Sequence, residues 1–208
     1  MVAVAGVGVL AAGAYLQYGG DDHAGAATPS VTAVTPAPLA SSGKTTSRAI
    51  PKPMPSSTRT ATMRPGRPTG ITLPQLNVTA PVVSIKAVHA ALTPPSDASM
   101  VGWWSGGAQP GATRGSAVIT GHTVHNGGGA FDDLGKLVPG SVVQVSTVRG
   151  QLQYRVATVT TYRKATLAKR AAQVFDQGVR GRLVLVTCED WNGQVYLSNV
   201  VVVALPMA

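Results

Sequence analysis

The chain has 208 residues, a formal net charge of +9 and a single cysteine. This length suits one domain of ordinary size, and a lone cysteine excludes an internal disulfide. The sequence also argues against a nucleic-acid partner, because it has only two phenylalanines, no basic helix face interleaved with aromatic residues, and no zinc or phosphate-loop motif.

Residues 1–18 carry no charged side chain and form a membrane or export segment. A spanning helix needs about 20 apolar residues, with a lower limit near 17, whereas the core of a signal peptide needs roughly 7–15. The segment lies close to this boundary. We interpret it as a transmembrane signal-anchor, with a signal peptide cleaved near residues 24–26 as the alternative.

Residues 19–63 are rich in Ala, Ser, Thr and Pro and have no periodic apolar face. Such a segment cannot bury enough apolar surface to offset the entropy lost on ordering, so we expect a disordered linker. Its Lys and Arg side chains would be attracted to anionic lipid or cell-wall polymer. The two segments together predict a domain held at the extracytoplasmic face of the cell membrane.

Residues 64–208 form the third region, in which short β-like runs alternate with Gly and Pro. The runs at 71–78 and 80–88 are expected to be edge strands, because their prolines cannot donate to a ladder. Val200 to Val203 are uniformly apolar, as in a strand covered on both faces. The other predicted strands are residues 116–120, 141–147, 151–162, 182–187 and 195–204.

Two short helices are expected between these strands. Residues 130–137 support one brief turn, and residues 164–174 have helical propensity but weak amphipathicity. Seven or eight short strands at this spacing favour an all-β, closed or nearly closed barrel over a βαβ sheet.

Cys188 and His122 each follow a strand-like apolar run. Strand ends present reactive groups to a cleft, so these two ends can bring an imidazole to a thiol. Such a pair can cleave an amide, because the thiolate attacks the carbonyl and the imidazolium protonates the leaving amine. We interpret Cys188 as a nucleophile and His122 as its partner; the alternative is an inert buried cysteine. His125 lies nearby, in a Gly-rich loop that suits poor positioning.

With these residues placed, the chain resembles a sortase from about Ile71 to Ala204. Ala117-Val-Ile-Thr-Gly-His122 matches the family's histidine motif, and Leu185-Val-Thr-Cys188 matches its cysteine motif. Four other segments match in the family's order: the opening strands at 71–83, the turn made by 101–104 and 111–115, the helix and turn at 131–141, and the last strand at 199–204.

The resemblance implies a membrane-anchored cysteine transpeptidase with an eight-stranded closed β-barrel, most similar to the actinobacterial class E and class F sortases. Sortases cleave a Leu-Pro-any-Thr-Gly type sorting signal between Thr and Gly, hold the secreted protein as a thioester, and pass it to an amine of a cell-wall precursor or a pilin. For this chain the resemblance implies a thioester on Cys188, a sorting-signal peptide and an amine nucleophile as partners, and no cofactor. Asp132 and Asp133 are too few for a calcium site, which needs about six oxygen ligands.

The chain departs from the family at one position. Sortases usually carry an arginine on the strand after the cysteine, but no Arg or Lys follows Arg182 here. Asn199 falls at that position when residues are counted back from Ala204, whereas class F-like patterns place the arginine near Leu197. Asn199 can donate a neutral hydrogen bond to an oxyanion or substrate. Alternatively, Arg163 enters from another strand, or the protein is a catalytically weak or inactive sortase-like binding module that lacks the usual arginine.

The residues that flank Cys188 complete the candidate site. Thr187 and Trp191 are candidate substrate-binding residues, and residues 189–191 are expected to open a short loop to the last strand. The carboxylate of Glu189 is expected to raise the pKa of the neighbouring thiol. An L,D-transpeptidase is disfavoured because its Ser-any-Gly-Cys-Arg segment is missing around Cys188, and papain-like hydrolases place the cysteine before the histidine.

Overall fold

The computed structural model of the protein describes residues 64–89 and 91–207. The segment at 1–18 and the linker at 19–63 lie outside the described residues. Within the two described ranges, no helix is long and apolar enough to span a bilayer. The elements in chain order are β1 Pro68–Leu73, the 3-10 helix η1 Pro74–Leu76, β2 Val78–Ile85, β3 Val101–Trp104, β4 Ser116–Gly121, the 3-10 helix η2 Leu134–Lys136, β5 Val142–Thr147, β6 Gly150–Arg163, α1 Lys164–Val174, β7 Arg182–Trp191 and β8 Tyr196–Pro206.

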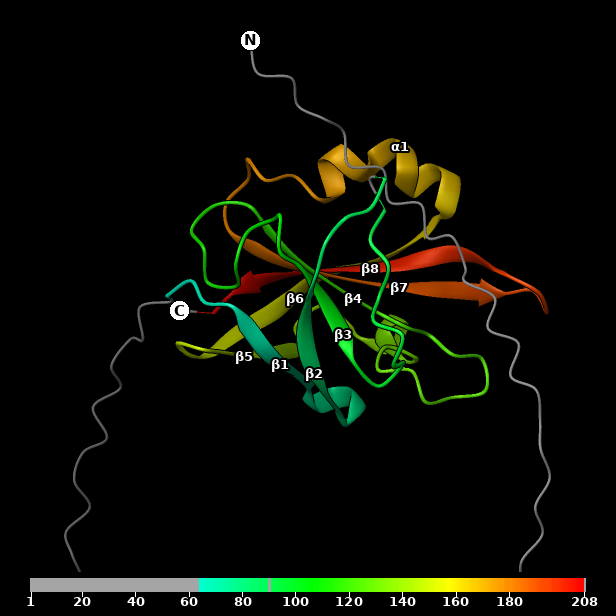
Figure 1. Cartoon of the computed structure of the whole chain (residues 1–208), viewed down its shortest axis with the longest axis horizontal. Helices are drawn as coiled ribbons and strands as arrows, with labels where there is room; N and C mark the ends of the chain where they lie inside the picture. The colour runs from blue at the N-terminus through cyan, green and yellow to red at the C-terminus, as the bar shows by residue number, and fades with distance from the viewer. Residues whose placement is uncertain (1–63, 90, 208) are drawn as a thin grey trace, which may run out of the picture. The chain divides into compact units, whose positions relative to one another are not determined.

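The strands of the described residues form one closed barrel in the order β1-β2-β3-β4-β7-β8-β6-β5 (Figure 1). Two neighbouring pairs, β2 with β3 and β4 with β7, are parallel, and the others are antiparallel. Strand β1 closes the sheet, because Ile71 pairs with Ala80 of β2 on one side and with Val145 of β5 on the other. The predicted eight-stranded closed barrel is therefore confirmed.

The expectation that the first two strands lie at edges is wrong, because every strand of a closed barrel has two neighbours. The two prolines are accommodated differently. Pro74 lies at the start of η1, outside the strands. Pro81 lies in β2, but the ladder with β3 begins only at Val82. The missing N–H of Pro81 therefore falls just before that ladder and interrupts nothing within it.

Two apolar clusters cover the two faces of the sheet. Side chains that alternate along all the strands fill the barrel interior, among them Ile119, Leu185, Val200 and Val202. The outer face of β4, β7 and β8 carries a second cluster, in which three residues of α1 pack on the strands. Val201 belongs to this outer cluster, so residues 200–203 are covered on both faces as predicted. The outer cluster consists of Leu92, Val118, Leu167, Ala171, Val174, Phe175, Val184, Val186 and Val201.

Helix α1 lies across one side of the barrel (Figure 1) and has the bounds that the sequence predicts. Its buried residues Leu167, Ala171 and Val174 are spaced by four and three positions, which places them on one helix face. The predicted turn at 130–137 is present as η2, a 3-10 helix shorter than expected.

The last two strands are longer than predicted. Residues 189–191, expected in a loop, continue β7, because Glu189 pairs with Ser198 and Trp191 with Tyr196. The turn itself is made by residues 192–195, where the Asn192 side chain accepts hydrogen bonds from the Gln194 and Val195 amides. Cys188 therefore lies inside a β-hairpin and not at a strand end.

Candidate active site

Cys188 lies on the outer face of the barrel, in a row of residues that crosses three strands. It pairs with Asn199 of β8, and Asn199 pairs with Tyr162 of β6. Residues directly opposite one another on neighbouring strands share a face. Tyr162 packs against the outer cluster, and Val186, two residues before Cys188, belongs to it. The thiol is therefore presented on the side of the sheet that α1 covers, and it is partly buried there.

His122 immediately follows β4, which runs parallel to β7. The ladder between them pairs Thr120 with Val186, so extending the same register by two residues places His122 opposite Cys188. Adjacent strands are about 4.8 Å apart. The backbone thus brings the histidine and cysteine motifs to neighbouring positions on the outer face.

The His122 ring is oriented by a carbonyl. Its Nε2 lies 2.7 Å from the Pro95 carbonyl oxygen, which can only accept a hydrogen bond. Nε2 therefore carries a proton, and in the neutral imidazole Nδ1 is the acceptor. In the described part of the chain, no hydrogen bond joins His122 to Cys188. The Pro95 carbonyl thus fixes the imidazole and leaves one ring nitrogen able to accept a proton.

The end of β4 is fixed to β7 by the residues that precede the histidine and the cysteine. A Cβ atom at Gly121 would lie 2.7 Å from the Phe131 ring and 3.0 Å from Val101, so this position admits only glycine. The Thr187 hydroxyl donates to the Gly121 carbonyl at 3.0 Å and lies 2.7 Å from the Thr123 hydroxyl. The Thr187 hydroxyl thus joins the Thr-Gly-His segment at the end of β4 to the Thr-Cys segment of β7, and we call this connection the Thr187 clip.

Thr187 does not lie where a substrate-binding residue was expected. Its side chain is 2% exposed and points to the opposite face of the sheet from Cys188. Its hydroxyl is also engaged between β7 and the end of β4. The structure gives Thr187 a role in holding the two motifs together.

Asn199 is buried and points its amide at the thiol. Its Nδ2 donates to the Thr187 carbonyl at 3.1 Å and lies 3.9 Å from the Cys188 sulfur. An amide nitrogen has two N–H donors, so one can hold the side chain in place while the other faces the sulfur. The residue found by counting from Ala204 is therefore in direct contact with Cys188.

Arg163 lies one row further along the same strands. It pairs with Ser198, so its side chain leaves β6 on the face opposite to Cys188. Its guanidinium lies 3.6 Å from the Asp190 carboxylate, which also accepts a hydrogen bond from Ser198 at 2.7 Å. The structure brings Asn199 to the thiol and leaves Arg163 paired with Asp190.

The electrostatics of Cys188 depend on burial and on one lysine. Burial raises the pKa of the thiol above its usual 9.0, and the positive charge of Lys164 lowers it in part. The predicted direction is confirmed, but the expected cause is wrong, because the Glu189 carboxylate contributes no part of this pKa shift. Glu189 faces the barrel end, where its Oε2 would lie 3.7 Å from a Cβ at Gly135. Sequence reasoning missed Lys164 because it searched for a cation on the strands alone.

Trp191 lies at the rim of the hairpin and is 39% exposed. Its indole stacks on the His125 ring, with the centroids 4.7 Å apart and the planes at 9°. Tyr196 packs against the same indole at 4.9 Å. His125, expected in a poorly ordered loop, thus ties the Gly-rich loop to the β7–β8 hairpin.

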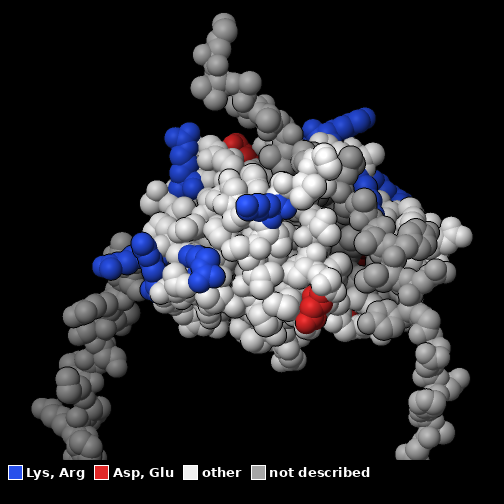
Figure 2. Space-filling view, in the orientation of Figure 1, with Lys and Arg blue, Asp and Glu red and all other residues white. Residues whose placement is uncertain are grey.

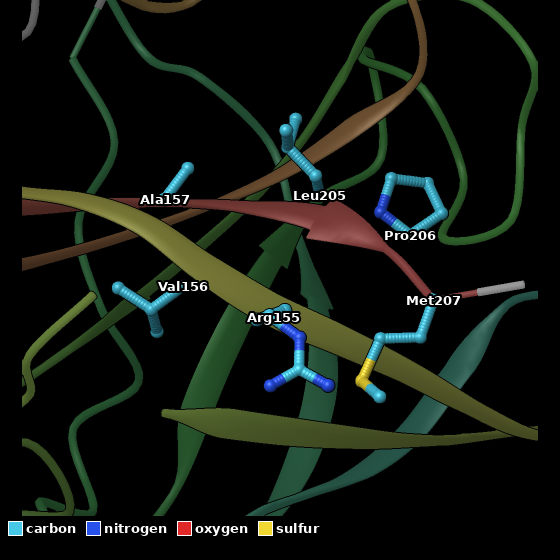
Figure 3. A pocket seen from close by; sticks show the side chains of 6 residues that line it. All are labelled: Arg155, Val156, Ala157, Leu205, Pro206 and Met207. Carbon is cyan, nitrogen blue, oxygen red and sulfur yellow. The ribbon is translucent and has the colours of Figure 1, made fainter. Parts of the chain in front are cut away.

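Cavities that indent the described part of the domain include the following two. One, of about 370 Å³, lies next to Glu189, the residue that follows Cys188, and is lined by Asp132, Asp133, Gly135, Lys136, Thr161, Glu189, Asp190 and Val200. The larger one, of about 470 Å³, lies at the far end of β6 and β8, around Arg155 and Met207 (Figure 3). None of the site residues lines this larger cavity.

Comparison with known proteins agrees with this geometry. The model of the sortase domain family matches residues 71–207, which is more than half of the chain. No curated protein matches the sequence.

Solved structures with the same fold include sortase C-1 from Actinomyces oris, which is 23% identical with a TM-score of 0.52 over 67% of this chain and 73% of that one. Sortase A from Corynebacterium diphtheriae is 20% identical, with a TM-score of 0.53 over 70% and 62%. Sortase C1 from Streptococcus agalactiae is 22% identical, with a TM-score of 0.52 over 69% and 68%. The family match together with the closed barrel shows that this chain belongs to the sortase family of cysteine transpeptidases.

Proposed function

We propose that the protein cleaves a Leu-Pro-any-Thr-Gly type sorting signal through a Cys188 thioester and transfers the secreted protein to an amine of a cell-wall precursor or a pilin. The observation that carries the proposal is the arrangement on the outer face, where Cys188 pairs with Asn199. The register of β4 and β7, which ends at Thr120 and Val186, leads His122 toward Cys188. Two motifs distant in sequence are joined in that arrangement by the Thr187 clip.

The first half of the reaction forms the thioester. The Cys188 proton passes to His122, and the sulfur attacks the carbonyl carbon of the signal's Thr to form a C–S bond. The C–N bond to Gly then breaks, and His122 returns the proton to the leaving amine. Because burial raises the pKa of the thiol, the protonated form of Cys188 is favoured and its proton must move during this step.

The second half regenerates the enzyme. The acceptor amine attacks the thioester carbonyl, a new C–N bond forms, and the C–S bond breaks. The proton lost by the amine returns through His122 to the sulfur. No oxidant or other co-reactant is needed, because one amide bond is exchanged for another.

Asn199 is the proposed neutral donor to the substrate or oxyanion. Each tetrahedral intermediate forms on the carbon bonded to the sulfur, next to the position at which the Asn199 amide already points. Removal of one such donor typically costs about 10²–10³ in rate. Arg163 is the weaker candidate, because it faces Asp190 on the other side of the sheet.

We also propose that residues 1–18 anchor the protein in the membrane and that residues 19–63 let the barrel reach its substrates at the extracytoplasmic face. The uncharged first segment and the Pro- and Ser-rich composition of the second support this placement. The short barrel, with one α-helix among the described residues, supports affiliation with the actinobacterial class E and class F enzymes.

The test is to incubate the protein with a panel of Leu-Pro-any-Thr-Gly-like peptides and to search by mass for an acyl-enzyme. We expect a mass increase equal to the peptide up to its Thr, released by a primary amine, and no increase in a His122→Ala variant. A folded protein that forms no adduct with any peptide of the panel would favour the alternative of a sortase-like binding module.

A further inference from the structure

The outer face of the barrel around Cys188 is in contact with α1. Leu167, Ala171 and Val174 of the helix pack in one cluster with Val186 of β7 and Val201 of β8. Because side chains alternate along a strand, Cys188 and Asn199 lie on the same face as Val186 and Val201, two positions further on. The first turn of α1 therefore begins next to the row that holds the thiol.

Lys164 is the first residue of α1 and belongs to the helix stripe that faces the barrel. It precedes Leu167 by three positions and Ala171 by seven, the spacing of one helix face. Accordingly it is half-buried, whereas Lys169 and Arg170 of the same helix are exposed. In the chain it follows Tyr162 by two residues, and Tyr162 pairs with Asn199.

We propose that Lys164 supplies the positive charge that stabilises the Cys188 thiolate, so that a lysine entering from the start of α1 takes the place of a cation on β8. The inference deepens the proposed function and rests on it. Lys164 acts through Cys188: its ammonium favours the ionised sulfur, and the sulfur carries out the attack. Thiolates are commonly stabilised by a nearby Lys or Arg.

Two further observations support this assignment. The charge of Lys164 lowers the pKa of Cys188 and opposes the effect of burial. In addition, residues 183–208 contain no Lys or Arg, so β8 itself offers no cation to the thiol. Asn199 supplies a neutral donor at 3.9 Å from the sulfur, and Lys164 supplies the charge that a neutral donor lacks.

The other ionisable groups around the site are distributed over both faces of the sheet. Glu189 and Asp190 of β7 line the acidic cavity, and Arg163 pairs with Asp190. The groups on the elements packed around Cys188 are His122 after β4, Tyr162 and Arg163 on β6, Glu189 and Asp190 on β7, Tyr196 on β8, and Asp132, Asp133 and Lys136 near η2.

The test is to measure, in the full chain, how the rate of Cys188 alkylation by iodoacetamide depends on pH. This measurement requires no sorting-signal peptide. Lys164→Met should slow alkylation at pH 7 by about threefold and move the rate profile to higher pH, since fewer sulfurs are ionised. Lys164→Arg should keep the wild-type profile. Lys169→Met, the same change at an exposed position of the same helix, should have no effect.

A wild-type profile in a folded Lys164→Met variant would overturn the inference, and so would a shift of equal size in Lys169→Met. If Lys164→Met fails to fold, Lys164→Gln provides the same removal of charge with a polar side chain. The two proposals can fail separately. If Lys164→Met changes the alkylation profile but the wild-type protein forms no acyl-enzyme with any peptide, only the proposed function is contradicted. If the wild-type protein forms an acyl-enzyme but Lys164→Met leaves the alkylation profile unchanged, only the role of Lys164 is contradicted.

Discussion

The two faces of the β7–β8 hairpin differ sharply in charge. On the outer face, Cys188 and Asn199 lie beside α1, and the charge that acts on the thiol is the positive one of Lys164. On the opposite face, the adjoining cavity is lined by four carboxylates, those of Asp132, Asp133, Glu189 and Asp190, and by one lysine, Lys136. Elsewhere, Lys and Arg side chains are spread over several parts of the visible surface (Figure 2).

The comparison teaches that a residue distant in sequence can act on the thiol more than its neighbour does. Cys188 and Glu189 are adjacent in the chain, but strand alternation directs them to opposite faces. The thiol is therefore influenced more by Lys164, which is 24 positions away, than by the carboxylate beside it. The following predictions test how complete this separation is.

The largest expected effect is on the outer face. Cys188→Ala should abolish acyl-enzyme formation, because the sulfur is the proposed nucleophile, while the partly buried site leaves the barrel folded. The measurement is the peptide adduct by mass together with circular dichroism. An adduct or transpeptidation that persists in the alanine variant refutes the assignment.

A smaller loss is expected at Asn199, again on the outer face. Asn199→Ala should lower kcat/KM by about 10²-fold, as expected for removal of one donor. Arg163→Met, which changes a residue on the opposite face, should be nearly silent. Steady-state kinetics with one peptide checks both variants, and the reverse ranking would assign the donor role to Arg163.

Thr187 points to the face opposite to Cys188 and joins β7 to the end of β4, so its replacement should affect stability as well as rate. Thr187→Val removes the hydroxyl that holds the Gly121 carbonyl, at a cost of about 1–3 kcal/mol in the free energy of unfolding. The rate of acylation should fall by about tenfold, because the end of β4, which His122 follows, is no longer fixed to β7. Thr158→Val, at an exposed position of β6, is the control for denaturation and kinetics. Equal stability of the two variants contradicts the clip.

The smallest effect is expected on the acidic face. Burial raises the thiol pKa above 9.0, so the wild-type alkylation rate should continue to rise as the pH passes 9. Glu189→Gln should change that rate by less than about twofold, because its carboxylate faces away from the sulfur. An alkylation rate that rises by close to tenfold in Glu189→Gln would show that the carboxylate on one face acts on the thiol on the other face.

The parts of the fold that were predictable are those with a local signal. The bounds of α1 follow from propensity alone, and residues 200–203 are apolar enough to show burial on both faces. The sequence predicts part of a turn where β3 forms, because four residues that include a glycine and two tryptophans give too short a strand pattern. The extension of β7 past Cys188 depends on pairing with β8, which no local signal reports.

The candidate site shows the same division. Cys188 and His122 were found from their motifs, and Asn199 by counting along one strand. Lys164 was missed because its relation to the thiol depends on how α1 packs on the barrel, and its own surroundings in the sequence are those of an ordinary helix start. Thr187 adjoins Cys188 in the sequence, but strand alternation turns its side chain away from the thiol and toward the Gly121 carbonyl.

The position of β8 also bears on the order in which the protein can acquire reactivity. Strand β8 is the last of the described strands in sequence but lies between β7 and β6, so the sheet stays open until β8 has been synthesised and inserted. Asn199 arrives at the sulfur only in that step. A nascent chain that ends before β8 carries the thiol without its donor and without a closed barrel, so maturation of the site is coupled to completion of the fold.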